Sequence, residues 1–111
     1  MSQRGRAGEG RFVVNVIRTD LGVIVAVADS ELLGKRVESG DGAVLYVNKE
    51  FYGEREVGED DVINAISAAD MVVLTGRRAV ELGVRLGLVA PGSEIVIGGV
   101  PHVQVFRSLV L

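Results

Sequence analysis

The sequence predicts a single-domain α+β protein in which two N-terminal β-hairpins are followed by an α-β-α-β segment. Three observations predict this class. β-branched residues in alternating or continuous runs fill much of the first half of the chain, two helical patterns lie in the second half, and 111 residues are enough for one hydrophobic core. We expect both helices to cover one side of a mixed sheet, with residues 12–111 forming the domain.

The first hairpin is predicted between residues 12 and 28. Residues 12–18 alternate between two faces, which is typical of a strand. Residues 19–22 (TDLG) have turn chemistry, and residues 23–28 are an almost continuous apolar, largely β-branched run. Because such a run is apolar on both faces, it indicates a strand in the middle of the sheet.

A second hairpin is predicted over residues 35–48, where two extended stretches flank the turn at 39–42 (SGDG). Between the hairpins, residues 29–34 have the composition of a single helical turn. Asp29 or Ser30 would cap this turn and Gly34 would end it. The chain then extends again.

Two amphipathic helices are predicted in the second half of the chain. The first spans residues 59–69 and begins with three acids, where the helix dipole favours negative charge. The second follows the junction at residues 75–78 and ends near Gly87, a C-terminal cap. Short strands are expected at residues 71–74, 94–97 and 102–106.

The junction before the second helix combines Thr75, Gly76, Arg77 and Arg78 directly after a buried strand. Two arginines in a first turn oppose the helix macrodipole, at a cost of about 0.3–1 kcal/mol each. A bound anion would convert this cost into a gain, with Thr75 as the cap and Gly76 allowing close approach. The alternative is that each arginine pairs with a surface acid such as Glu81.

A second candidate region is the loop that begins with Gly98 and Gly99 and ends at His102. In a β-α-β unit with short connections, this loop would lie near the arginine junction. His102 is the only histidine, so it is the side chain able to titrate near neutral pH. A lone histidine beside a proline is also typical of a packed residue, and both roles stay open.

Tyr52 forms an aromatic pair with Phe51 just before a glycine. An exposed Tyr52 would be able to stack on a base or a ligand. Aromatic side chains mostly bury their area, however, and this favours an aromatic lid over the edge of the core.

Composition and motifs exclude several classes of chemistry. The chain has no cysteine, which excludes disulfides and thiolate catalysis. It contains neither a Walker loop nor a dinucleotide fingerprint, and its acids lack metal-ligand spacing. We therefore predict no catalytic residue set, no cofactor and no metal. No apolar run approaches the ~20 residues of a membrane span, and no secretory signal begins the chain, which predicts a cytoplasmic protein without a membrane partner.

Charge is distributed unevenly along the chain. The net charge of -3 excludes a protein that coats nucleic acid non-specifically. Residues 1–11, however, carry Arg4, Arg6 and Arg11 against Glu9, and their composition predicts a disordered basic arm. A local basic surface is therefore compatible with the acidic total.

These features lead to three functional hypotheses. The first is a non-enzymatic protein that binds RNA or a ribonucleoprotein through the basic junction, the loop at 98–102 and the arm. The alternative is a protein or enzyme that holds a small phosphate or carboxylate ligand at the helix N-terminus, with His102 as the acid–base group. The third is a protein-interaction module that uses the apolar tail at residues 107–111. The oligomeric state is left open.

Four ordered motifs resemble those of a known protein family. They are ELLGK at 31–35, FYG at 51–53, Gly76 with RAVEL at 78–82, and IGGVPH at 97–102. The family is the archaeal one known as domain of unknown function 424, and the resemblance spans residues 12–102. It implies a small cytoplasmic single-domain protein and implies no activity. In the family's pattern position 77 is often not basic, which favours Arg78 over Arg77 as the functional arginine.

Overall fold

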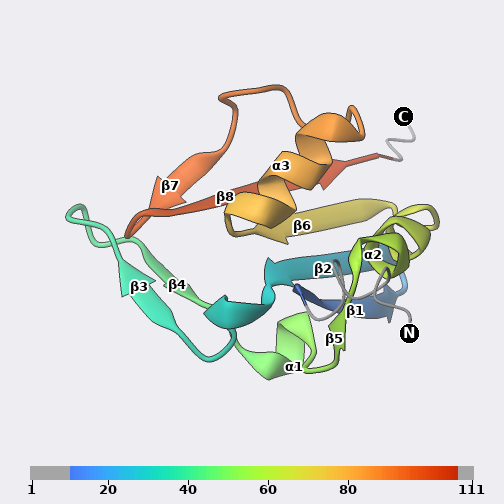
Figure 1. Cartoon of the computed structure of the whole chain (residues 1–111), viewed down its shortest axis with the longest axis horizontal. Coiled ribbons are helices and arrows are strands. Elements are labelled where there is room, and N and C mark those ends of the chain that lie inside the picture. The colour runs from blue at the N-terminus through green and yellow to red at the C-terminus, as the bar shows by residue number, and fades with distance from the viewer. Residues whose placement is uncertain (1–10, 108–111) are drawn as a thin grey trace, which may run out of the picture.

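Our computed structural model describes residues 11–107, and its centre is a six-stranded mixed sheet with the strand order β5-β1-β2-β6-β8-β7 (Figure 1). Strands β3 and β4 form a separate two-stranded ribbon that projects from one end of this sheet. Of the predicted basic arm and apolar tail, only Arg11 and Arg107 lie within the described residues. The elements in chain order are β1 (Phe12–Thr19), β2 (Gly22–Asp29), a 3-10 turn (Ser30–Leu32), β3 (Arg36–Glu38), β4 (Val44–Tyr46), α1 (Lys49–Tyr52), β5 (Glu56–Val57), α2 (Glu59–Ile66), β6 (Met71–Thr75), α3 (Arg77–Arg85), β7 (Ile95–Ile97) and β8 (Val100–Phe106).

The register of the sheet confirms the predicted first hairpin and the mixed sheet. β1 and β2 are antiparallel, with Phe12 opposite Asp29. β2 lies inside the sheet, as its continuous apolar run predicts, and its other neighbour β6 is parallel to it, with Ala28 beside Thr75. β8 then pairs antiparallel to β6. The carboxyl ends of β2 and β6 therefore lie next to each other.

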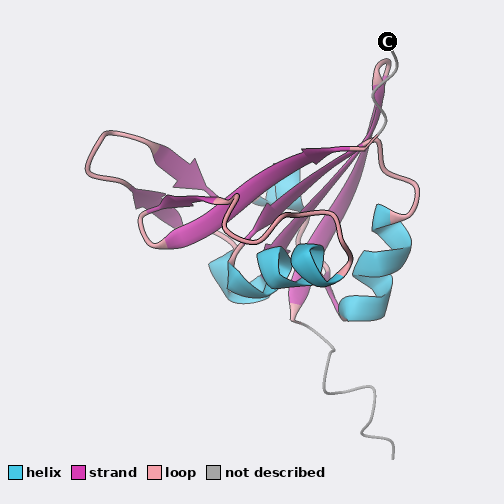
Figure 2. Ribbon diagram, turned by 90° about the horizontal axis from the view of Figure 1, so that it is seen from above, coloured by secondary structure: helices cyan, strands magenta, loops and turns pink. Residues whose placement is uncertain are grey.

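Alternating side chains divide the core into two layers, one on each face of the sheet. Figure 2 shows the helices distributed over both faces. The two longer helices, α2 and α3, share one face, as predicted, and cover Phe12, Val25, Val27, Val72 and Leu74. On the opposite face, α1 and the β3–β4 ribbon cover Val13, Ala26, Ala28 and Val73.

The short helix α1 and the end of α2 differ from the prediction. α1 has only four residues, too few for a periodic pattern, and is capped by Asn48, whose side chain accepts the Phe51 N–H at 2.8 Å. α2 ends at Ile66, where the Ser67 hydroxyl donates to the carbonyl of Asn64 and competes with the helical pattern. None of the helices in residues 11–107 is long and apolar enough to cross a membrane.

Strand β6 passes into helix α3 through one residue, Gly76. Its N–H donates to the carbonyl of Pro101 on β8 at 2.9 Å, which is a bond of the sheet. Its carbonyl accepts the N–H of Val80 at 3.0 Å, which is a bond of the helix. Gly76 therefore belongs to both elements.

Candidate functional site at the carboxyl edge of the parallel strands

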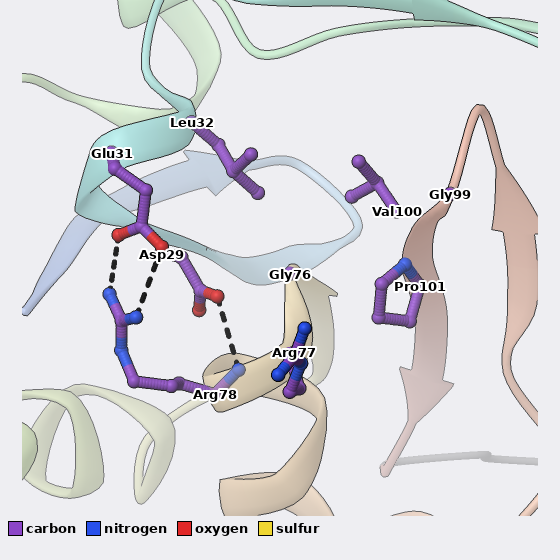
Figure 3. Close-up of a pocket in the computed structure, with 9 residues that line it drawn as sticks. All are labelled: Asp29, Glu31, Leu32, Gly76, Arg77, Arg78, Gly99, Val100 and Pro101. Carbon is purple, nitrogen blue, oxygen red and sulfur yellow. Dashed lines mark hydrogen bonds and ion pairs between the residues drawn. The ribbon is translucent and has the colours of Figure 1, made fainter.

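A cleft of about 410 Å³ opens where the parallel strands β2 and β6 end (Figure 3). Ligands of open α/β sheets commonly bind at this kind of edge, because loops and helix N-termini meet there. The walls come from the end of β2, the 3-10 turn, the first turn of α3 and the start of β8. The lining residues are Asp29, Glu31, Leu32, Gly76, Arg77, Arg78, Gly99, Val100 and Pro101.

The anion at the N-terminus of α3 is supplied by the chain itself. Both carboxylate oxygens of Asp29 accept backbone N–H groups of the helix, one from Arg78 at 3.1 Å and one from Ala79 at 2.9 Å. The prediction that Thr75 caps the helix is wrong, because Gly76 occupies the cap position. The acceptor for the helix N–H groups is Asp29, which is 49 and 50 residues away from the two donors in the sequence. The cost of the two arginines is thus offset by an internal carboxylate.

Asp29 is almost fully buried, with 3% of its surface exposed. Burial raises the pKa of this carboxyl, while the N–H groups of Arg78 and Ala79 and the charge of Arg78 act in the opposite direction. The 3-10 turn that follows receives no side-chain bond from Asp29, although Asp29 is its cap residue. The carboxylate is therefore used for α3 and not for the turn predicted at residues 29–34.

The Cβ-free backbone of Gly76 is what lets Asp29 reach the helix. Gly76 has a φ of 107°, and a Cβ built there would lie 2.4 Å from the Cγ of Asp29. The predicted close approach at Gly76 is therefore explained by a side chain of the same protein.

Arg78 is committed to structure rather than to an external ligand. Its guanidinium forms a two-pronged ion pair with Glu31, with Nη1 at 3.0 Å from Oε2, and Nη2 also donates to the carbonyl of Arg11 at 3.0 Å. Figure 3 shows this guanidinium turned toward Glu31. The hydrogen bonds from Arg78 lower the pKa of Glu31. The surface-acid alternative therefore holds for Arg78, with Glu31 in place of Glu81.

Arg77 differs from its neighbour. It lines the cleft and is exposed, and within residues 11–107 its side chain has no hydrogen bond or ion pair. Arg11 adds positive charge nearby, since its guanidinium contributes to lowering the pKa values of Glu31 and Glu59. The carboxylates lining the cleft, those of Asp29 and Glu31, are already hydrogen-bonded, whereas Arg77 is available to an anion.

Thr75, Tyr52 and His102 form a hydrogen-bonded chain beneath the sheet edge. The hydroxyl of Thr75 lies 2.8 Å from that of Tyr52 and 2.9 Å from Nδ1 of His102. Tyr52 is 3% exposed and Thr75 is fully buried. The hypothesis that a base stacks on Tyr52 is therefore wrong, and the alternative, an aromatic side chain that covers the edge of the core, is confirmed.

His102 is a packed, half-buried residue outside the cleft. Burial lowers its pKa, and its ring lines a separate hollow of about 250 Å³ with Gln104. It does not share the cleft with Arg78, so the convergence that an acid–base role requires is not present. Of the two loop glycines, Gly99 lines the cleft, while Gly98 packs against the β3–β4 ribbon, where a Cβ would lie 2.7 Å from that of Val37.

The predicted and observed sites overlap in Gly76, Arg77, Arg78 and Gly99. The strongest omission is Asp29, which was predicted only as a cap for the local turn. The sequence contained one signal for Asp29: it is the single acid at the end of a continuous apolar strand, which places it where the carboxyl ends of the strands meet. Val100 and Pro101 belong to the predicted loop at 98–102, whereas Glu31 and Leu32 carry no comparable signal and line the cleft only because of the topology.

Comparison with known proteins agrees with this fold. The sequence profile of a family described as Protein of unknown function (DUF424) matches residues 17–108. No curated protein matches the chain. The chain is similar to the crystal structure of an uncharacterized conserved protein from Methanopyrus kandleri, with 26% sequence identity, a TM-score of 0.69, and coverage of 90% of this chain and 96% of that chain.

Proposed function

The chain belongs to the family described as Protein of unknown function (DUF424), so a function has to be inferred from the residues of the chain itself. We propose that it is a non-enzymatic protein that binds single-stranded RNA at the carboxyl-edge cleft. The observation that carries the proposal is Arg77. It is an exposed cation at a cleft whose carboxylates, Asp29 and Glu31, are already satisfied. A phosphate placed there would meet one available guanidinium and would displace no existing ion pair.

The electrostatics of the surroundings favour a flexible, weakly held polyanion. Arg77 and Arg78 line the cleft and Arg11 lies near Glu31, so three arginines offset the two carboxylates of the cleft although the chain as a whole is at -3. Phosphate contacts of this kind supply affinity without sequence information. We propose a single strand because its flexible backbone can enter a cleft of about 410 Å³.

The test compares two arginine variants of the full chain. Binding of a fluorescein-labelled oligouridylate would be followed by fluorescence anisotropy over a series of KCl concentrations. We expect Arg77→Ala to weaken binding and to reduce the slope of log K against log [salt] by about 0.7, the value for one phosphate contact to a single strand. Arg18→Ala is the matched control, because Arg18 is also exposed and lies opposite Val23, at the end of the β1–β2 hairpin away from Asp29.

Two results would overturn the proposal. One is the absence of salt-sensitive binding by the wild-type protein. The other is equal binding by the Arg77→Ala and Arg18→Ala variants, which would place the RNA elsewhere on the surface.

A small phosphate or carboxylate ligand is the second candidate, favoured by the size of the cleft. Its volume of about 410 Å³ lies within the range of roughly 300–1,000 Å³ that small-molecule sites occupy. Titration with inorganic phosphate, followed by amide shifts at Gly76, Arg77 and Gly99, separates the two candidates. Saturable shifts without RNA binding would favour the small ligand. His102 has no place in this version, because it lies outside the cleft.

A further inference from the structure

The sheet face opposite α2 and α3 carries an exposed strip along β8. His102, Gln104 and Phe106 alternate along this strand, so they share that face, and they stand opposite Thr75, Val73 and Met71 of β6. α1 covers the part of the face nearer β1 and β2, and the ribbon packs against the β7–β8 turn at Gly98. Gln104, in contrast, is exposed, and Phe106 is 66% exposed. We call these three residues the β8 strip.

The chemistry of the β8 strip suits bases rather than phosphates. It presents an imidazole, a carboxamide and a phenyl ring, without a charged side chain. Ile95 flanks His102 on β7, and Met71 flanks Phe106 on β6. Successive members of the strip are about 7 Å apart and its ends about 13 Å apart, from the rise of a strand. This spacing matches a few splayed nucleotides, and aromatic rings on a sheet face are a common platform for unpaired bases.

The β8 strip is continuous with the cleft. Val100 and Pro101 line the cleft and are followed directly by His102 on the same strand. The cleft, which Arg77 also lines, therefore adjoins the His102 end of the strip. At the other end Phe106 borders a hollow of about 580 Å³, which also contains Asp20 and Asp70.

We propose that the β8 strip binds the bases of the RNA strand whose phosphate lies at Arg77. Phe106 stacks on one base, and the amide of Gln104, which can both donate and accept, hydrogen-bonds to a base edge. His102 is held in place by the bond from Nδ1 to Thr75 and turns Nε2 toward Gln104, 3.4 Å from its amide nitrogen. This assignment rests on the proposed function and adds base contacts to it.

The test separates bases from phosphates by using two polyanions. Affinity of the full chain would be measured for the labelled oligouridylate by anisotropy and for inorganic polyphosphate, which has no bases, by calorimetry. We expect Phe106→Ala to weaken oligouridylate binding about tenfold, within the range that base–aromatic stacking supplies, and to leave polyphosphate binding unchanged. Phe106→Tyr should bind as the wild type does. Gln104→Ala should weaken oligouridylate binding about threefold.

Val96→Ala is the matched control. Val96 is also apolar and 58% exposed, but it stands opposite Pro101 on β8, next to Ile95, which stands opposite His102. Its side chain is therefore on the other face of the sheet. Its variant should bind both polyanions normally, and thermal melts should show that all variants fold.

Each contrary outcome is informative. If Arg77→Ala weakens oligouridylate binding while Phe106→Ala and Gln104→Ala do not, the RNA function stands and the β8 strip is overturned. If Phe106→Ala reduces oligouridylate and polyphosphate binding equally in a folded protein, the strip does not contact bases and is also overturned. If the wild type binds neither polyanion, the proposed function and the strip both fall.

Discussion

The carboxylate of Asp29 fills the space in which a side chain at Gly76 would begin. A Cβ at Gly76 would lie within 3 Å of all three carboxyl atoms of Asp29. The same carboxylate closes the first turn of α3 through two N–H groups. The end of β2 and the start of α3 are therefore held together by one buried acid and one glycine.

Substitution of Gly76 should be strongly destabilising. We expect Gly76→Ala to lower the free energy of unfolding by about 3 kcal/mol, because a φ of 107° is strained for alanine and the cap from Asp29 is displaced. Gly87→Ala is the matched control: Gly87 also has a positive φ, 78°, but a Cβ there meets nothing within 4 Å. It should cost about 1 kcal/mol. Urea unfolding followed by circular dichroism measures both, and equal losses would contradict the role of Asp29.

Removal of the carboxylate should reproduce part of this loss. Asp29→Ala leaves two helix N–H groups without their acceptor and should cost about 2 kcal/mol. Asp29→Asn keeps one acceptor oxygen and should cost about half as much. Asp20→Ala removes an exposed acid and should stay within about 0.5 kcal/mol of the wild type. Chemical denaturation of the three variants would test this order, and a neutral Asp29→Ala would refute the cap.

Substitution of the two adjacent arginines should have different effects: Arg78→Ala should lower stability, whereas Arg77→Ala should weaken RNA binding without lowering stability. Arg78→Ala breaks the pair with Glu31 and the bond to the carbonyl of Arg11, and should lower the unfolding free energy by about 1 kcal/mol, since the site is partly exposed to water. Arg77→Ala should leave stability within about 0.5 kcal/mol. Thermal melts at matched ionic strength measure the contrast, which would be lost if Arg77 also had a structural partner.

The buried position of His102 predicts a pH-dependent stability. Because burial disfavours the charged ring, the folded pKa lies below the ordinary value of 6.5. The neutral ring contributes its full stability above the unfolded pKa of 6.5, and this stability is lost as the pH falls through the folded pKa. We expect the unfolding free energy to decrease as the pH falls below 6.5, the ordinary pKa of the ring in the unfolded chain. His102→Gln should reduce this dependence.

NMR titration of the imidazole provides the direct measurement. Among the described residues, no charged group shifts the pKa of His102. The hydroxyl of Tyr52 is linked to the imidazole only through the hydroxyl of Thr75. A midpoint above 6.5 would therefore contradict burial as the dominant influence.

The periodic parts of the fold could be predicted because their signals are local. The alternation before Thr19 and the β-branched run after Gly22 define a hairpin within one short stretch. Gly83, inside α3, packs closely against the sheet, since a Cβ there would lie 2.5 Å from Leu74.

The site was less predictable because its contacts are remote in sequence. Asp29 and α3 are separated by about half of the chain, and no local pattern shows that a strand end will cap a distant helix. The two arginines in the first turn of α3 indicated an anion at this helix N-terminus, and the structure places the carboxylate of Asp29 there. The arginines did not indicate that the anion would be internal.

Pro101 has a consequence for where the sheet stops. Gly76 and Pro101 stand opposite each other as the next pair after Thr75 and His102, and a typical residue at 101 would return an N–H to the carbonyl of Gly76. Proline has no N–H, so that carbonyl is left to Val80. Pro101 on β8 therefore ends the hydrogen-bond ladder at Gly76 and leaves the carbonyl of Gly76 free to accept the first hydrogen bond of α3.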